Sequence, residues 1–352
     1  ALDGSTGEVV IDPDPATRAD FEARRDAHLA AREAARAFRG KRVGVGDREV
    51  AVAANVGGTA DLERAVDVAA DGIGLFRTEF LFLDRDEAPT EEEQADIYRR
   101  AAAAFDQPVV IRTFDIGGDK PAPYLTAPTD EENPFLGVRG ARLYPRERDL
   151  FADQVRAIVR ATETGDPWLM LPMVSTLDEI RELMAVVDEI AADLIAREPG
   201  LRRPPVGVMV EVPSIALVAD AVAEHVDFFS IGTNDLTQYT FAADRTNGAL
   251  DHLQDPLHPA VLALCTFTRA AARRRGVSVS VCGLAAADPA GAALFAGMGI
   301  DKLSVAAASV NPIKATLSGL DPDRLGELVE RCLAASSAAE VRALVGEVLE
   351  SV

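Results

Sequence analysis

The sequence predicts an α/β fold, a barrel of eight parallel strands with helices between them, and three observations point to it. Eight short apolar runs recur between residues 50 and 306. Most of them are separated by stretches rich in Ala, Leu, Glu and Arg that are long enough for a helix. Six of the runs have a polar residue at or next to their C-terminal end. Alternating strands and helices in this number favour a (β/α)8 or TIM barrel, although strand counting alone also allows an open doubly wound sheet.

The predicted strands are nearly continuous in hydrophobicity, as parallel strands buried on both faces require. In chain order they are Val50–Asn55, Gly72–Arg77, Val109–Arg112, Leu169–Val174, Val206–Glu211, Phe228–Gly232, Val277–Gly283 and Lys302–Ala306. The main intervening helices are expected at Thr59–Ala70, Thr90–Phe105, Thr176–Arg197, Pro213–Glu224, Pro259–Arg275 and Pro289–Gly297. A closed barrel brings the carboxyl ends of its strands to one mouth, where active sites of this fold lie.

The segment before the first strand has two different patterns. Residues 9–11 are apolar and lie between turn formers, as at the end of a preceding β structure. From Pro15 to Arg39 the chain is rich in Ala, Arg and Glu and stops at Gly40, which predicts a solvated linker helix. The expected parts are residues 1–14, the end of a preceding domain; 15–48, a linker helix; and 49–352, the barrel.

Composition and charge restrict the partners. A net charge of −21 repels polyanions, so nucleic acid is not an expected partner. The chain has no apolar stretch of membrane-spanning length and no signal-peptide pattern at its start, so membrane insertion is not expected. Three scattered cysteines make neither a CxxC pair nor an even disulfide framework. We therefore expect a reducing, cytoplasmic location.

Arginines at strand ends or in loops indicate a phosphorylated ligand. Arg77, Arg112 and Arg245 lie outside helical charge ladders, and a guanidinium group matches a phosphate bidentately. A single arginine more often forms a surface ion pair, but three that converge on one mouth favour phosphate binding. Arg139 and Arg142 are candidates for further anion contacts.

Two carboxylates indicate a magnesium site. Glu211 ends one apolar run, and Asp235 directly follows Asn234 after the next run. One carboxylate from each of two strands, completed by ligand and water, is the usual way in which proteins hold Mg²⁺. Either carboxylate could instead cap a helix, but Glu211 follows five apolar residues. No Cys/His cluster has zinc spacing.

Cys282 is a candidate proton donor. It ends an apolar run directly before Gly283, so its thiol would face the mouth. A thiol with a pKa of about 8.5 is mostly protonated at neutral pH. A lone cysteine on a strand is more often a small buried hydrophobe. Cys265 and Cys332, in helical patterns, are expected in the core.

Four long motifs, taken together, resemble one known family. They are Gly72–Arg85, Ile111–Lys120, Glu132–Gly137 and Asp227–Thr240. They strongly resemble enzyme I, the phosphoenolpyruvate–protein phosphotransferase of the bacterial sugar phosphotransferase system. The similarity extends from the linker helix to the C-terminus.

This resemblance implies a barrel that binds phosphoenolpyruvate and forms a homodimer. The implied substrate-binding residues are Arg77, Arg112, Arg142, Asn234, Asp235 and Arg245. Glu211 and Asp235 would bind Mg²⁺. Cys282 would be the catalytic acid that protonates enolpyruvate at carbon 3 as pyruvate forms.

The chain departs from the family pattern in two ways. Members of the family carry, before the barrel, a domain with the phosphate-accepting histidine and a helical domain that binds the phosphocarrier protein. Neither is found here, so we expect the C-terminal half of a longer protein, unable to complete phosphotransfer without that phosphohistidine domain. The family usually has Cys-Gly-Glu where this chain has Cys282, Gly283 and Leu284.

Two other functions stay open. The barrel of a pyruvate phosphate dikinase or phosphoenolpyruvate synthase is similar and takes the same ligand, although Gln238–Thr240 followed by Ala242–Arg245 looks more like enzyme I. A non-catalytic module that binds phosphoenolpyruvate and dimerises is the second alternative. The missing histidine and Leu284 mildly favour it.

Overall fold

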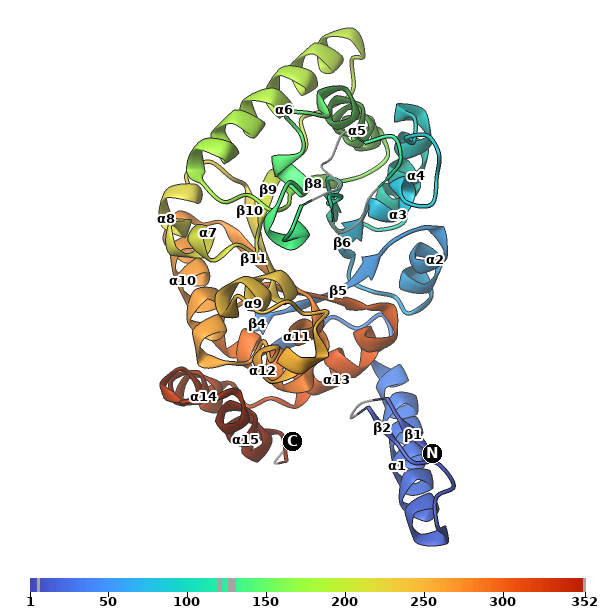
Figure 1. Ribbon diagram of the computed structural model, residues 1–352, viewed down its shortest axis with the longest axis vertical. Coiled ribbons are helices and arrows are strands. Elements are labelled where there is room, and N and C mark those ends of the chain that lie inside the picture. The colour runs from blue at the N-terminus through green and yellow to red at the C-terminus, as the bar shows by residue number, and fades with distance from the viewer. Residues whose placement is uncertain (5–6, 119–121, 126–130, 351–352) are drawn as a thin grey trace.

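The computed structural model describes residues 1–4, 7–118, 122–125 and 131–350. Asp119 and Lys120, at the end of the second motif, lie outside the described residues. The main body is a closed barrel in which strands β5 to β12 follow one another in chain order and β12 pairs with β5 (Figure 1). Every neighbouring pair of barrel strands is parallel. The predicted (β/α)8 barrel is therefore confirmed.

The barrel strands agree with the predicted runs to within three residues at each end. They are β5 (Ala51–Val56), β6 (Ile73–Arg77), β7 (Val109–Arg112), β8 (Pro167–Leu171), β9 (Val206–Val210), β10 (Phe228–Gly232), β11 (Ser278–Cys282) and β12 (Lys302–Ala306). All residues of β9 and β10 are buried. Helices cover the outer faces of the strands, which explains why the apolar runs show no polar alternation.

Helices surround or extend the barrel, and some of them begin at a side-chain cap. Those that follow the barrel strands and surround the barrel are α2 (Thr59–Asp67), α3 (Glu79–Phe82), α4 (Glu91–Ala103), α5 (Arg148–Arg160), α6 (Leu177–Arg197), α7 (Pro213–Leu217), α8 (Ala219–Val222), α9 (Thr233–Phe241), α10 (Pro259–Arg275), α11 (Leu284–Ala287), α12 (Pro289–Met298) and α13 (Val310–Gly319). Capping boxes start α4 at Thr90 and α6 at Thr176. Helices α14 (Pro322–Ala334) and α15 (Ala338–Leu349) pack outside α12. No helix in the described part of the chain is long and apolar enough to cross a membrane.

The N-terminal segment projects from the barrel (Figure 1). Helix α1 covers Pro15–Ala35, and its only buried residue is Ala35. The antiparallel pair β1 (Leu2–Asp3) and β2 (Glu8–Val9) is tied to α1 by an ion pair of 2.7 Å between Arg24 and Asp3. A short 3₁₀ turn (Arg36–Phe38) and the hairpin of β3 (Gly44–Val45) and β4 (Arg48–Glu49) then lead into the barrel.

The interior of the barrel is packed with side chains. The buried residues that form this inner cluster are Leu75, Val110, Met170, Met209, Phe228 and Cys282. Trp168 packs against the cluster and stands 5.0 Å from Phe228, centroid to centroid. The lumen is therefore a core rather than a pore, and the two ends of the barrel are separate surfaces.

Candidate active site

A cavity of about 670 Å³ lies at the carboxyl ends of the barrel strands. Predicted site residues from the ends of five barrel strands (β6, β7, β9, β10 and β11), or from the loops after them, line it. They are Arg77, Arg112, Glu211, Asn234, Asp235, Arg245 and Cys282. The strand-end polar residues of the sequence thus meet at one place, together with Asn55 from β5.

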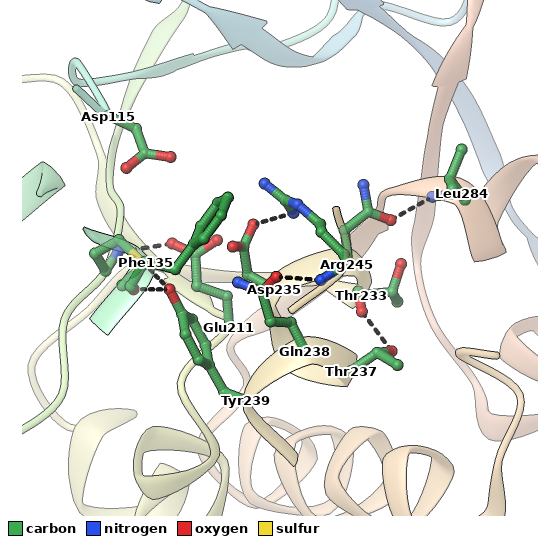
Figure 2. A network of polar contacts seen from close by, with 12 residues as sticks. Asp115, Phe135, Glu211, Thr233, Asp235, Thr237, Gln238, Tyr239, Arg245 and Leu284 are labelled. Carbon is green, nitrogen blue, oxygen red and sulfur yellow. Dashed lines mark hydrogen bonds and ion pairs between the residues drawn. The ribbon is translucent and has the colours of Figure 1, made fainter. Parts of the chain in front are cut away.

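Glu211 and Asp235 are buried carboxylates of this cavity (Figure 2). Glu211 Oε1 accepts a hydrogen bond of 2.7 Å from the Met173 amide, whereas its Oε2 has no hydrogen-bond partner. Asp235 Oδ1 also lacks a hydrogen bond and lies 3.6 Å from an Arg139 nitrogen. Burial, reinforced by the charges of Asp235 and Asp115, raises the pKa of Glu211 to about 8. Two carboxylates with unused acceptor capacity are the donor set that a bound cation would satisfy.

Asp235 belongs to a series of six side chains of alternating charge, which we call the charge chain. Ion pairs connect successive members in the order Glu79, Arg112, Asp115, Arg139, Asp235 and Arg245. Burial alone would lower the pKa of Arg112, but the charges of Glu79 and Asp115 outweigh burial and raise it. The Arg112 guanidinium is therefore held charged and in place where it borders the cavity.

Helix α9 and the turn after it position the polar groups on another side of the mouth (Figure 2). Asn234 Oδ1 accepts a hydrogen bond of 3.0 Å from the Leu284 amide. Ala242 ends α9 with a left-handed φ of 49°, which turns the chain back. The backbone amide of Arg245 then donates a hydrogen bond of 2.9 Å to Gln238 Oε1. The Arg245 guanidinium forms an ion pair with Asp235, with 2.9 Å between Nη1 and Oδ2. Arg245 is thus fixed over the carboxylates.

Cys282 ends β11 at the floor of the cavity. Its Sγ lies 3.8 Å from Ser230 Oγ and 3.5 Å from the Ile231 carbonyl. Burial raises the pKa of the thiol to about 11, so the thiol holds its proton at neutral pH. A protonated thiol is a proton donor rather than a nucleophile. Cys265 and Cys332 are buried, as expected for core residues.

The two remaining predicted arginines lie in different surroundings. Arg77 is exposed, lines the cavity and stands 5.1 Å from the Phe80 ring centroid. Arg142 is not among the described residues that line the cavity. It donates to the Leu136 carbonyl at 3.1 Å and to Ser175 Oγ at 2.8 Å. Arg142 therefore ties down the loop between β7 and α5.

Comparison with known proteins identifies the family. A family model described as "PEP-utilising enzyme, PEP-binding domain", in which PEP stands for phosphoenolpyruvate, matches residues 33–321. The chain belongs to this family. Its match covers the whole barrel, which confirms the likeness drawn from the four motifs.

Curated relatives of this PEP-utilising domain carry related names. A phosphoenolpyruvate-protein phosphotransferase of Haloferax volcanii is 46% identical over 97% of the chain, and one of Bacillus subtilis is 40% identical over 98%. A multiphosphoryl transfer protein of Rhodobacter capsulatus is 41% identical over 97%. The chain spans 60%, 61% and 41% of these proteins.

The sequence analysis missed two buried acids of the charge chain, Glu79 and Asp115. It treated Arg139, which also belongs to the charge chain, only as a candidate anion contact. Glu79 comes two residues after Arg77, and Asp115 comes three residues after Arg112. Loops that follow barrel strands point toward the mouth, so this placement was a usable signal. Arg139 instead has a buried structural place between two carboxylates.

Proposed function

We propose that this PEP-binding domain binds phosphoenolpyruvate with Mg²⁺ and supports transfer of its phosphoryl group to a histidine on a separate domain, with release of pyruvate. In this proposal the reaction is the first step of a sugar phosphotransferase system. The domain acts as a cytoplasmic homodimer, and the phosphohistidine domain passes the group to a phosphocarrier protein. The single observation that carries the proposal is one cavity that combines cationic side chains with two buried, under-coordinated carboxylates.

The cationic side chains suit the substrate. Phosphoenolpyruvate carries a phosphate and a carboxylate, and the whole chain, at −21, would repel such an anion. Arg77, Arg112 and Arg245 bring local positive charge to the cavity. A single guanidinium group can bind two phosphate oxygens at once, which orients the phosphoryl group as well as attracting it. Asn234 would add an amide donor to the same anion.

The carboxylates suit magnesium. Glu211 and Asp235 would hold the ion, since Mg²⁺ is usually bound by one or two carboxylates, waters and substrate phosphate oxygens. Within the described residues, no group of three or more His, Cys, Asp or Glu side chains is arranged to hold a metal. In this proposal the protein therefore supplies two ligands, and water and substrate oxygens supply the others. When bound, Mg²⁺ offsets the negative charge of the phosphoryl oxygens.

The chain's own residues perform two tasks in this reaction. Arg112 and Arg245 stabilise charge on the phosphoryl oxygens as the phosphorus–oxygen bond to enolpyruvate breaks and the bond to the histidine nitrogen forms. Cys282 then donates the proton on its Sγ to carbon 3 of the enolate, which gives pyruvate. The thiolate regains a proton from water. Since the pKa of Cys282 is about 11, the required protonated form dominates at neutral pH.

The test is pyruvate release after addition of a purified phosphohistidine domain, with phosphoenolpyruvate and Mg²⁺. We expect Cys282→Ser to slow release by about 100-fold or more and to leave the affinity for phosphoenolpyruvate nearly unchanged. Cys265→Ala is the matched control and should keep the rate, because Cys265 is a buried cysteine in α10 that is not among the described residues lining the cavity. Equal loss of rate and affinity in Cys282→Ser would make the residue structural.

The same assay separates the alternatives. Pyruvate release that requires added nucleotide would favour the dikinase or synthase barrel. Normal binding with no pyruvate, even with the histidine domain present, would favour the non-catalytic module. Sedimentation analysis tests the homodimer, which should have twice the 37.4 kDa mass of one chain.

A further inference from the structure

A second cavity, of about 170 Å³, lies at the opposite end of the barrel, where the strands begin. Its wall includes Val110, Trp168 and Phe228, which belong to the packed interior or lie against it. That interior separates this cavity from the candidate active site. The cavity is therefore an independent site, and a ligand bound there lies outside the proposed function.

Lys302, the first residue of β12, is the cation of this cavity. Its ammonium group lies 5.7 Å from the centroid of the Trp168 ring, a distance at which a cation is attracted to the ring face. Among the residues that the structure describes, no hydrogen bond or ion pair of this ammonium group is found. Lys302 thus faces an apolar wall with no anionic partner in direct contact.

The carboxylates near Lys302 are already paired with other cations. Three of them act on it electrostatically, and their ion pairs are Asp71–Lys314 at 2.6 Å, Asp166–Arg202 at 3.1 Å and Asp301–Arg269 at 3.6 Å. Asp166 also accepts the indole hydrogen of Trp168 at 3.0 Å, and Asp301 accepts the Val279 amide at 2.8 Å. Burial lowers the pKa of Lys302 in spite of these carboxylates. Its positive charge is therefore incompletely compensated.

We propose that this cavity binds a small monocarboxylate, whose carboxylate pairs with Lys302 and whose apolar end packs on Trp168 and Phe228. A cavity of 170 Å³ holds roughly six non-hydrogen atoms, at about 30 Å³ for each water-sized unit. Asp301 lines the same cavity, so a ligand with two or more negative charges is disfavoured. A single carboxylate on a short apolar body satisfies the charge, the walls and the volume.

The chain offers a specific reporter for this site. Trp168 is its only tryptophan, so the intrinsic tryptophan fluorescence reports on this cavity. The experiment titrates sodium butyrate, which has six non-hydrogen atoms, into the protein. Butyramide, which has the same shape without charge, and sodium chloride at equal ionic strength serve as controls. We expect a saturable fluorescence change with butyrate alone.

Two variants test the role of the charge. Lys302→Met keeps the aliphatic stem against Trp168 and should weaken butyrate binding about tenfold or more, which is the effect of one lost charge-assisted contact. Lys302→Arg keeps the charge and should retain binding, which separates loss of the site from misfolding. Phosphoenolpyruvate at saturating concentration should leave the butyrate response in place.

Each opposite result overturns the proposal. No saturable change in the wild-type protein, or an equal response to butyramide, would mean that the cavity does not recognise a carboxylate. An unchanged response in Lys302→Met would remove Lys302 from the site. Loss of the butyrate response on addition of phosphoenolpyruvate would place butyrate at the other mouth.

Discussion

Replacing Arg139 by methionine tests whether the buried charge chain organises the candidate active site. Arg139 has a side chain that is 0% exposed, and its guanidinium donates to Asp115 at 3.1 and 2.7 Å. It lies 3.6 Å from Asp235 and is not among the described residues that line the cavity. We therefore expect Arg139 to position the carboxylates of Asp115 and Asp235 rather than to bind substrate.

The size of the effect follows from these contacts. Removing one partner of a buried ion pair leaves an uncompensated charge and costs about 3–5 kcal/mol of unfolding free energy. Asp115 keeps Arg112 as a second cation at 3.4 Å, so the low end, about 3 kcal/mol, applies. Methionine fills the space of the arginine stem and limits any cavity contribution.

Urea unfolding, followed by far-ultraviolet circular dichroism, measures this loss. The matched control is Arg197→Met, because Arg197 pairs with Asp193 with side chains 72% and 55% exposed. That control should change stability by no more than about 0.5 kcal/mol. The double variant with Asp115→Asn should be less destabilised than the sum of the single variants by about 1–3 kcal/mol. A loss in Arg139→Met as small as in the control would refute a positioning role for the charge chain.

Three further predictions concern other buried groups. Because the pKa of Cys282 is about 11, its alkylation by iodoacetamide, followed by peptide mass spectrometry, should rise about tenfold per pH unit from about pH 7 to about pH 9; a plateau below pH 9 would contradict the raised pKa. Because the pKa of Glu211 is about 8, Mg²⁺ binding at neutral pH should release its proton, and Mg²⁺ affinity should increase with pH up to about 8. Calorimetry in two buffers of different ionisation enthalpy checks this, and equal heats would speak against it. Lys314→Met should cost about 3–5 kcal/mol in urea unfolding, because fully buried Lys314 pairs with Asp71 at 2.6 Å; a loss below about 1 kcal/mol would show that the pair is dispensable.

Much of this fold follows from the sequence for a simple reason. Strands buried on both faces must be apolar along their length, so runs such as Val206–Glu211 are visible without tertiary information. The polar residues at the ends of most of these runs, such as Arg112 and Cys282, then lie at the mouth because all eight strands point the same way. Only the convergence of these residues is established by the fold; their chemical roles stay predictions.

The parts that the sequence did not reveal depend on the paths of loops. Arg139 and Arg142 are three residues apart, and nothing local distinguishes them. Gly140 separates them with a left-handed φ of 55°, at a point where a Cβ would lie only 3.0 Å from the Met173 side chain. Arg139 is extended and bridges to Gly117, which turns it inward toward Asp115. Such contacts between distant segments leave no periodic pattern in the sequence.

The most direct measurement of the central claim is calorimetric titration of phosphoenolpyruvate into the protein with and without Mg²⁺. We expect saturable binding that Mg²⁺ strengthens in the wild-type chain. In Glu211→Gln, which keeps the shape of the side chain but not its charge, Mg²⁺ should give no such gain. Absence of binding under both conditions, or an equal Mg²⁺ effect in Glu211→Gln, would contradict the assignment of this cavity.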